Sequence, residues 1–221
     1  MPTPLNPARP QVRLLVFAAS LRADSLNKKL AAIVARHFEQ RGVTVDHAQM
    51  RELDCPSYDG DREQREGIPA GAEELKRRLL ANDAFVIVSP EYNASMPGML
   101  KNVIDWTSRF RPQPFDSRHG LLLSASPSMV GGNRGLWSLR VPLEHLGTRI
   151  FPDMFSLSQA HKAFNGDALA DAGLATRLEK TLDSFLELVE AARHYPCIKK
   201  AWIEFLGEKP GEAADRVDAK A

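Results

Sequence analysis

The stretch FAASLRADSLNKKL at 17–30 gathers side chains that could bind an anion. Ser20, Arg22, Ser25 and Asn27 lie between a short apolar run and the first residues of a helical pattern. A helix that begins near Ser25 presents unpaired backbone N–H groups and the positive end of its dipole. Hydroxyl and amide groups add neutral hydrogen bonds, and the guanidinium adds a planar charged fork. The stretch favours a phosphate monoester site; the alternative is that Ser25 only caps the helix and Arg22 is a solvated surface charge.

Two further segments carry polar groups of the same kind. SPEYNASMPG at 89–98 follows one apolar run, and SASPSMVGGNRG at 124–135 follows the next. The first of these can place backbone N–H and C=O groups, together with the ring of Tyr92, along the edge of a flat heterocycle. The alternative is that Tyr92 packs over the edge of a sheet and Asn93 only tolerates a left-handed turn.

Several other chemistries are not supported by the sequence. It contains no lysine-bearing phosphate loop and no three-glycine dinucleotide fingerprint. No serine lies in the glycine-flanked elbow of hydrolases. His119, His145 and His161 lack the spacing of metal ligands or of a proton relay, so we interpret them as structural. We therefore expect no metal site and no catalytic dyad of side chains.

The composition is that of an ordinary globular protein. The chain has 221 residues, of which 43% are apolar and 26% charged, and its formal net charge is +1. That charge gives no general attraction to nucleic acid or anionic lipid. No apolar run approaches the roughly 18 residues that cross a bilayer, and MPTPLNPARP lacks the apolar core of a secretory signal. We expect a cytoplasmic protein without nucleic-acid or membrane partners, and no disulfide between Cys55 and Cys197.

Apolar periodicity divides the chain into alternating strands and helices. The expected strands are 12–18, 43–47, 84–89, 120–125 and 148–152, and the expected helices are 25–41, 73–81, 98–109, 136–146 and 169–193. The polar stretch 54–71 is too long for a tight connection and is a candidate functional loop. The alternation predicts one α/β domain with an open, doubly wound parallel sheet. Ligands of such sheets bind beyond the carboxyl ends of the strands, where all three polar segments fall.

Two of the motifs resemble a known family. SLRADSLNKKLA, followed further along by PEYNASMPGMLKNVIDWTSR, closely resembles the NADPH-dependent FMN reductase family, which includes quinone, azo-dye and chromate reductases. The resemblance covers 12–193. It implies a flavodoxin-like fold with a five-stranded sheet, non-covalently bound FMN, and assembly as a homodimer or homotetramer. The implied domain is 12–195, between a disordered or extended N-terminal segment, 1–11, and a C-terminal extension, 196–221.

Carried over by position, the resemblance implies FMN-binding residues in all three polar segments. The set is Ser20, Arg22, Ser25, Leu26, Asn27, Pro90, Glu91, Tyr92, Asn93, Ser126 and Gly131. Residues of the first segment would hold the phosphate, and those of the second would line the isoalloxazine ring. Ser126 and Gly131 would approach the ring from the third segment. The chain departs from the family pattern at Ala19 and Ser128, where glycine is frequent.

The activity that the resemblance implies is that of an FMN-dependent oxidoreductase. It would use NADPH, or NADH, to reduce a small electron acceptor: a quinone, a flavin, an azo compound or a metal oxyanion. The flavin carries out hydride transfer, which explains why no side-chain dyad is found. If NAD(P)H and the acceptor occupy the same open face of the flavin in turn, the kinetics are ping-pong. Two alternatives stay open, a flavodoxin-type one-electron carrier and a flavin-binding protein without turnover; the net charge of +1 argues against a carrier, because carriers are typically strongly acidic.

Analogy with the family suggests roles for residues outside the three segments. Arg109 and Arg111 are candidates for contacting the 2′-phosphate of NADPH, or are ordinary surface cations. The helix that contains Lys101, Asn102 and Trp106 could serve dimerisation, and Trp106 is interpreted as a core or subunit-interface residue. The polar stretch 54–71 could reach over the flavin of a neighbouring subunit.

Overall fold

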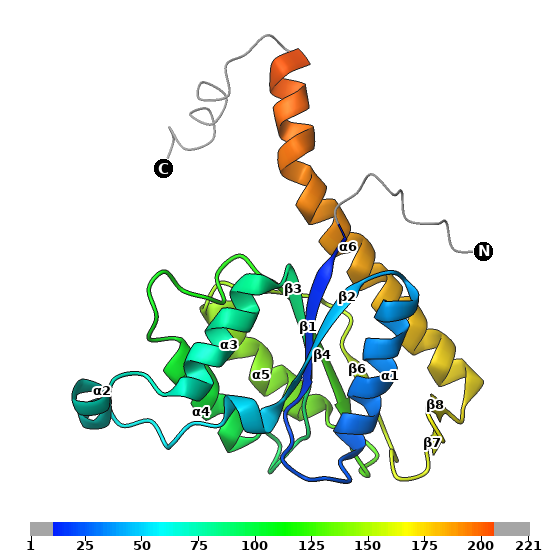
Figure 1. Cartoon of the computed structure of the whole chain (residues 1–221). Coiled ribbons are helices and arrows are strands. Elements are labelled where there is room, and N and C mark those ends of the chain that lie inside the picture. The colour runs from blue at the N-terminus through cyan, green and yellow to red at the C-terminus, as the bar shows by residue number, and fades with distance from the viewer. Residues whose placement is uncertain (1–10, 206–221) are drawn as a thin grey trace. The chain divides into compact units, whose positions relative to one another are not determined.

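The computed structural model has a parallel sheet between two layers of helices (Figure 1). It describes the backbone of residues 11–205 and the side chains of residues 11–194. The chain divides into two compact units, 1–185 and 186–221, and all three polar segments lie in the first. The strand order is β2-β1-β3-β4-β5 and all of these neighbours are parallel. The predicted doubly wound, flavodoxin-like sheet is therefore confirmed.

The elements alternate along the chain much as the apolar pattern predicts. The strands are β1 (Arg13–Ala18), β2 (Thr44–Gln49), β3 (Ala84–Val88), β4 (His119–Ala125), β5 (Arg149–Ile150) and β6 (Phe155–Leu157), with a small antiparallel hairpin of β7 (Phe164–Asn165) and β8 (Ala168–Leu169). The helices are α1 (Leu26–Gln40), η1 (Met50–Leu53, a 3-10 helix), α2 (Gly60–Glu66), α3 (Ala70–Ala81), α4 (Gly98–Thr107), α5 (Asn133–His145) and α6 (Ala172–Phe205).

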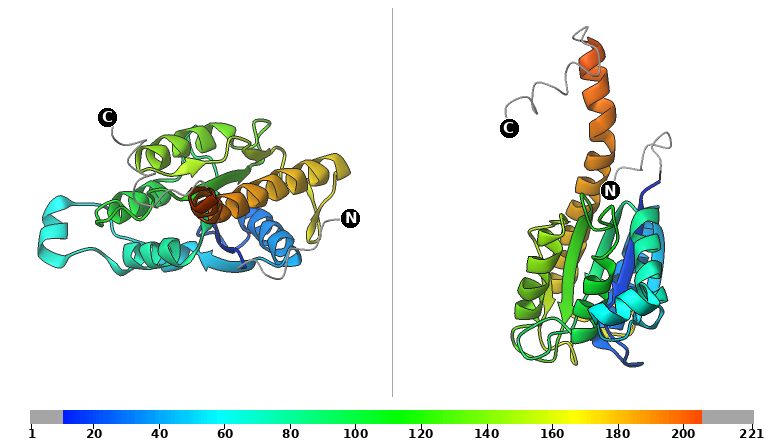
Figure 2. Two further views of the ribbon diagram at one scale, coloured as in Figure 1. Left: turned by 90° about the horizontal axis from the view of Figure 1, so that it is seen from above. Right: turned by 90° about the vertical axis from the view of Figure 1, so that its left-hand side faces the viewer.

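Helices cover both faces of the sheet, as the view from above in Figure 2 shows. On one face α3, α4 and α5 contribute Leu75, Val103 and Leu139 to a core that includes Leu15 and Ile87 of the strands. The other face is covered by α1 and by the part of α6 that belongs to the first unit, which ends at Phe185. Because the central strands are buried on both faces, β3 has no exposed position and its sequence is a continuous apolar run.

The fifth strand differs from the expected 148–152. Only Arg149–Ile150 pairs with β4 as β5, and beyond Pro152 the chain returns to β4 as β6. Proline donates no backbone hydrogen bond and its φ is fixed, so strands are commonly interrupted where it occurs. The segment β6 was not predicted, because three residues are too few to show a periodicity.

Two other expectations require correction, and one element was missed. The expected loop 54–71 contains α2, a helix with no buried residue. The helix expected at 169–193 begins at Ala172 and continues to Phe205, so its predicted end was wrong. The β7–β8 hairpin was not predicted. Residues 1–10 and 206–221 lie outside the described part of the chain, and with them most of the expected N-terminal segment 1–11 and C-terminal extension 196–221. Residues 196–205 of that extension belong to α6. Within the described part, no helix is both long and apolar enough to cross a membrane.

Candidate functional site

The three polar segments meet at the carboxyl edge of the sheet, the lower edge in Figure 1. The backbone N of Ala19 donates to the carbonyl oxygen of Val88 at 2.9 Å, and the N of Ser89 donates to the carbonyl oxygen of Leu123 at 2.8 Å. These bonds continue the ladder of β1, β3 and β4 past the strand ends, so the three loops begin side by side. The chain reverses its direction across the sheet at β1 and β3, where doubly wound folds bind their ligands.

The first loop leaves its hydrogen-bonding groups available. Ser20 and Ser25 are largely buried, yet neither hydroxyl has a hydrogen-bond partner among the described residues. Ser25 has the extended backbone of an N-cap, with φ −83° and ψ 128°, but its side chain does not cap α1. Arg22 is exposed and forms no ion pair within the described part of the chain. The loop therefore offers two hydroxyls, a guanidinium and the first N–H groups of α1 to an external anion.

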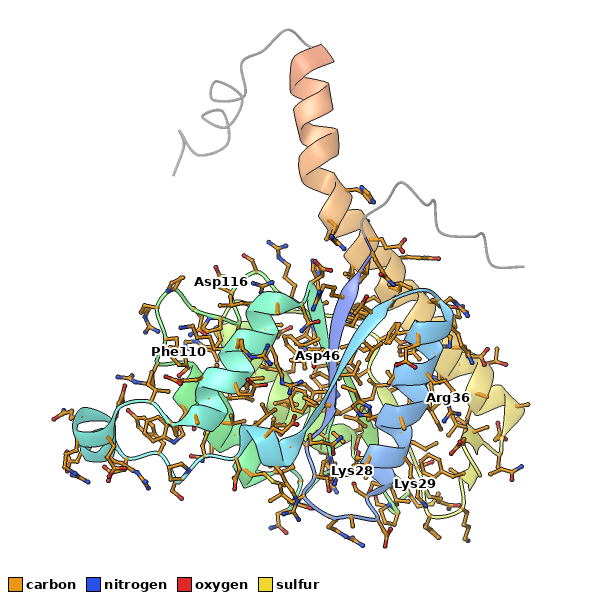
Figure 3. All side chains as sticks on the ribbon, in the orientation of Figure 1. Lys28, Lys29, Arg36, Asp46, Phe110 and Asp116 are labelled. Atoms are coloured by element: carbon orange, nitrogen blue, oxygen red, sulfur yellow. The ribbon has the colours of Figure 1, made fainter. Side chains whose placement is uncertain are left out.

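Two lysines add positive charge at the start of α1. Lys28 and Lys29 follow the half-buried Leu26 in the first turns of the helix (Figure 3), and the first turn has no acidic residue. Cations at a helix N-terminus oppose the helix dipole by about 0.3–1 kcal/mol each, a cost that a bound anion would remove. Neither lysine is among the residues predicted from the sequence, although the pair follows Asn27 directly.

Asn27 holds the start of α1 against the end of β4. Its Nδ2 donates to the carbonyl oxygen of Ala125 at 2.9 Å, and its Oδ1 accepts from the Ala125 N at 2.9 Å. Asn27 is buried, so these bonds satisfy backbone groups that water does not reach. One N–H of the amide remains for a ligand. Asn27 thus fixes the first loop relative to the third.

The second loop forms a tight hairpin with an exposed tip. Tyr92 and Ser95 exchange both of their backbone hydrogen bonds, at 2.9 and 3.0 Å. Between them, Asn93 and Ala94 have φ values of 51° and 62°. Asparagine tolerates this left-handed region, whereas it costs most other residues about 1–2 kcal/mol. Such strain is found where the surrounding structure enforces it, often at ligand sites. Tyr92 is 47% exposed and therefore accessible to a ligand.

Pro90 and Glu91 lie at the base of that hairpin and face inward. Pro90 is buried, and its carbonyl oxygen accepts from the hydroxyl of Ser89 at 3.0 Å. The side chain of Glu91 is only 7% exposed and its carboxylate binds Arg134 and the backbone of Gly135. The carboxylate is thus engaged with α5, which leaves the backbone of Glu91 for a flat ligand.

The third loop is hydrogen-bonded to the end of β6. The backbone N of Ser126 donates to the carbonyl oxygen of Leu157 at 3.0 Å, and the Ser126 hydroxyl accepts from the N of Ser128 at 3.2 Å. Gly131 has φ 63°, and a Cβ there would lie 2.9 Å from the N of Ser158. Only glycine combines this backbone conformation with so close an approach. Ser126 and Gly131 therefore give the loop its shape at the site.

Comparison with known proteins identifies the family. Residues 12–162, more than half of the chain, match the NADPH-dependent FMN reductase family. The chain belongs to this family. A quinone reductase of Escherichia coli (strain K12) is 43% identical over 140 residues, which are 63% of this chain and 73% of that protein. An NAD(P)H-dependent FMN reductase of Pseudomonas aeruginosa is 33% identical over 156 residues, 70% of this chain and 82% of that protein.

Solved structures agree with the family. FerB, a flavoenzyme NAD(P)H:(acceptor) oxidoreductase from Paracoccus denitrificans, has a TM-score of 0.71 at 30% identity, covering 81% of this chain and 97% of that one. A flavodoxin from Pseudomonas aeruginosa, at 16% identity and TM-score 0.54, covers 81% of this chain and 99% of its own and shares the fold. The enzyme class predicted from the sequence, an NAD(P)H-dependent FMN reductase or quinone reductase, is confirmed.

Other candidate residues of this FMN reductase have partners within the chain. The Nε of Arg109 donates to the carboxylate of Glu63 at 3.0 Å, and the guanidinium of Arg111 donates to neighbouring backbone carbonyl groups. Trp106 is fully buried and its Nε1 donates to the carbonyl oxygen of Pro56 at 2.8 Å. Trp106 is therefore a core residue, and it anchors the chain that leads to α2.

The histidine on β4 and the acidic residues do not suggest further chemistry. Burial lowers the pKa of His119, and neither of its ring nitrogens has a hydrogen-bond partner among the described residues. The ring therefore stays neutral at physiological pH. The same part of the chain has no group of three or more His, Cys, Asp or Glu residues placed to hold a metal ion.

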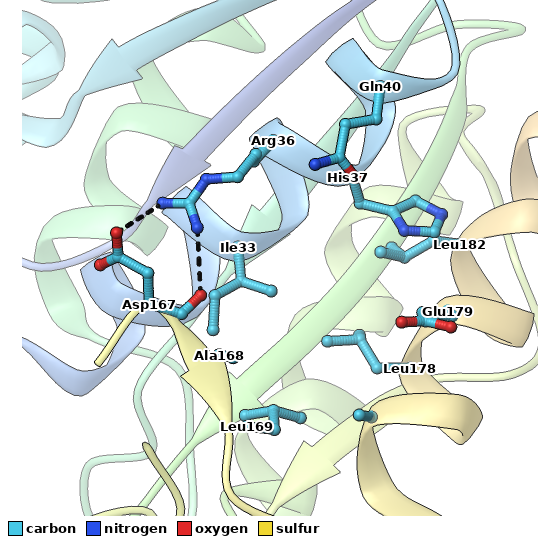
Figure 4. Close-up of a pocket in the computed structure, with 11 residues that line it drawn as sticks. Ile33, Arg36, His37, Gln40, Asp167, Ala168, Leu169, Leu178, Glu179 and Leu182 are labelled. Carbon is cyan, nitrogen blue, oxygen red and sulfur yellow. Dashed lines mark hydrogen bonds and ion pairs between the residues drawn. The ribbon is translucent and has the colours of Figure 1, made fainter. Parts of the chain in front are cut away.

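A separate cavity of about 210 Å³ lies beside the C-terminal half of α1 (Figure 4). Leu169, Leu178 and Leu182 form its apolar walls, and the ion pair of Arg36 with Asp167 lies at its edge. None of the predicted FMN-binding residues lines this cavity. The candidate flavin site of the reductase is therefore the open carboxyl edge of the sheet.

Proposed function

We propose that this reductase holds FMN by its phosphate at the start of α1 and uses NAD(P)H to reduce quinones. The observation that carries the proposal is the set of donors without partners at that point: the hydroxyls of Ser20 and Ser25, the guanidinium of Arg22 and the first N–H groups of α1. Both hydroxyls lack a hydrogen-bond partner within the described part of the chain, so they can donate to a bound anion without breaking an existing bond.

The charges at this site suit a phosphate monoester. Arg22, Lys28 and Lys29 outnumber the one nearby acid, Asp24. Each hydrogen bond to a charged ligand contributes about 1.5–3 kcal/mol, so several converging ones select a dianion over neutral compounds. The remaining N–H of Asn27 is a further donor to the same group.

The hairpin and the third loop would orient the ring of the flavin. When bound there, FMN supplies the redox chemistry, accepting hydride from NAD(P)H and passing it to the acceptor. The backbone of Pro90 and Glu91 and the tip residues Tyr92 and Asn93 would line one edge of the ring, with Gly131 allowing close approach on another. Because this edge of the sheet is open, NAD(P)H and the acceptor would occupy it in turn, and initial-rate plots at several acceptor concentrations should be parallel.

A quinone is the acceptor that similarity favours. The quinone reductase of Escherichia coli is 43% identical, and a 2-hydroxy-1,4-benzoquinone reductase of a Burkholderia species is 33% identical over 121 residues, 54% of this chain and 63% of that protein. Free flavin, azo dyes and chromate should be compared with benzoquinone in the same assay, with NADPH and with NADH.

We also propose that the enzyme assembles as a homodimer or homotetramer. Met129, Trp137 and Val141, on the third loop and α5, are 75%, 56% and 69% exposed. Trp137 and Val141 are four residues apart and so share one face of α5, and an exposed apolar patch of this kind is typical of a contact with another subunit. Asn102, by contrast, is occupied within the chain, since its amide binds the backbone of residues 55–58. Light scattering of the purified protein measures the number of subunits.

The decisive experiment is a titration of the apoprotein with FMN, followed by anaerobic addition of NADPH and then benzoquinone. The double variant Arg22→Ala/Ser25→Ala should weaken FMN binding by about 100-fold or more, as expected for two lost hydrogen bonds to a charged group. Arg36→Ala, an exposed arginine further along α1, is the matched control and should bind FMN normally.

Each failure has a distinct meaning. Unchanged FMN affinity in the double variant would reject the phosphate site. Bound FMN that NADPH does not reduce would indicate a binding protein without turnover. Reduction by a partner protein but not by NADPH would indicate an electron carrier.

A further inference from the structure

The carboxylate of Glu91 joins two loops of the flavin site. Its Oε1 accepts hydrogen bonds from the Nε and Nη2 of Arg134, at 2.9 and 2.6 Å, and its Oε2 accepts one from the backbone N of Gly135 at 3.1 Å. The Glu91 side chain is 7% exposed, whereas that of Arg134 is 60% exposed. A nearly buried carboxylate from the second loop is thus bound to the first turn of the helix that follows the third loop.

That helix has no cap of its own. The residue before α5 is Gly132, with φ 87°, and no side chain caps the helix from this position. A Cβ at Gly132 would lie 2.0 Å from the hydroxyl oxygen of Ser124, so the usual capping residues, serine, threonine and aspartate, do not fit. The backbone N of Gly135, in the first turn, would be left without an acceptor if Glu91 were absent. A negative charge at this end also favours the helix dipole.

The second loop packs directly against the first turn of α5. A Cβ at Gly135 would lie 3.1 Å from the Cβ of Glu91 and 3.2 Å from its Cα, so the loop and the helix are in backbone contact. A second connection lies one turn along α5, where the hydroxyl of Ser138 accepts from the N of Met96 at 2.8 Å and donates to the carbonyl oxygen of Gly135 at 2.8 Å.

We infer that Glu91 is a positioning residue, whose carboxylate caps α5 from the second loop and thereby holds the exposed hairpin Tyr92–Ser95 in register with the third loop. This inference rests on the proposed function and extends it. The left-handed backbone of Ala94, which is strained, needs rigid support at the base of the hairpin. The two hydrogen-bonded connections, by Glu91 and Ser138, supply that support on the side away from the tip.

Variants of Glu91 and Arg134 distinguish the effect of the helix cap from that of the ion pair. Arg134→Ala removes the exposed arginine but leaves the bond from Gly135, so FMN affinity should stay within about twofold of the original. Glu91→Ala removes the cap and should weaken FMN binding by about tenfold, a typical effect of losing a hydrogen bond to a charged group. Glu91→Gln, which keeps an acceptor of the same shape without the charge, should fall between them. Glu144→Gln, an exposed acid later on α5, is the control.

Three measurements distinguish positioning from general stabilisation. The visible circular dichroism of bound FMN should change in Glu91→Ala, because the ring is held differently. The rate of flavin reduction at saturating NADPH should fall, so that kcat changes as well as KM. Hydrogen exchange in the apoprotein should lose protection at the first turn of α5 and at Met96, and remain unchanged in Arg134→Ala.

The outcomes are decisive in either direction. Folded Glu91→Ala protein with unchanged FMN affinity, dichroism and reduction rate would overturn the inference, even if its thermal stability fell. An equal loss in Arg134→Ala would show that the ion pair, not the cap, holds the loop, and would overturn it too. If the unmodified protein did not bind FMN, the proposed function would fail, and the hydrogen-exchange comparison would still decide whether Glu91 caps α5.

Discussion

The thiol of Cys55 shows how strongly its surroundings set the chemistry of one side chain. Burial, and after it the charge of Asp54, raises the pKa of this thiol to about 11, from an ordinary value of 9.0. Because the thiolate is the reactive form, the ionised fraction should be about 100-fold lower than for a free cysteine. We expect iodoacetamide to alkylate Cys55 of folded protein about 100-fold more slowly than of protein unfolded in urea. Mass spectrometry of the Cys197→Ser variant, in which Cys55 is the remaining cysteine, measures both rates.

Rates that were equal in folded and unfolded protein would contradict this expectation. They would mean that the thiol ionises as it does in water, and that the loop before α2 opens faster than the reagent reacts.

Single residues of the site were predictable where their neighbours in the sequence determine their setting. Ser20 and Ser25 stand between a strand and a helix, and that junction alone places Ser20 just after β1 and Ser25 directly before α1. The partners of Asn27 and Glu91 were not predictable, because they lie 98 and 44 residues away along the chain. Which polar group faces a ligand, and which faces another loop, is settled by tertiary contacts that no local pattern contains.

Between elements, one carboxylate connects α1 to α6. Burial alone would raise the pKa of Asp183, but hydrogen bonds from Arg41 and His37 outweigh it and hold the pKa below its ordinary 3.8. A carboxyl group whose pKa is lower in the folded chain than in the unfolded chain stabilises the fold at pH values above its unfolded pKa. That stabilisation is lost as the pH falls through the pKa of the folded chain. We expect Asp183→Asn to lower the free energy of unfolding by roughly 1 kcal/mol at neutral pH, and the difference to shrink only below about pH 4.

Urea unfolding of the two proteins at a series of pH values tests this expectation. Asp167→Asn is the control, since the side chains of Asp167 and its partner Arg36 are 84% and 45% exposed and such pairs contribute little. A difference between Asp183→Asn and the original protein that grew as the pH fell would have the wrong sign for a depressed pKa.

Elements were predictable in proportion to their length and burial. The run AFVIV is identifiable as β3 because every position there is apolar, and the leucines of α3 repeat at helical spacing. The short β6 and α2, which has no buried residue, carry neither signal. Their conformation depends on pairing with β4 and on the hydrogen bonds of Asp59 at the start of α2, respectively.

The whole molecule should be more stable with FMN than without it, because the ligand binds the folded chain and not the unfolded one. At about 100 times its Kd, a ligand of this kind stabilises by about 2.7 kcal/mol. For a chain of this size each kcal/mol raises Tm by about 2–4 °C, so we expect a rise of about 5–10 °C by scanning calorimetry. Riboflavin has the same ring without the phosphate and should give a much smaller rise at the same concentration, since the donors at the start of α1 would find no anion. An equal rise with both ligands would mean that the ring alone is recognised, and that Ser20, Arg22 and Ser25 do not form the site.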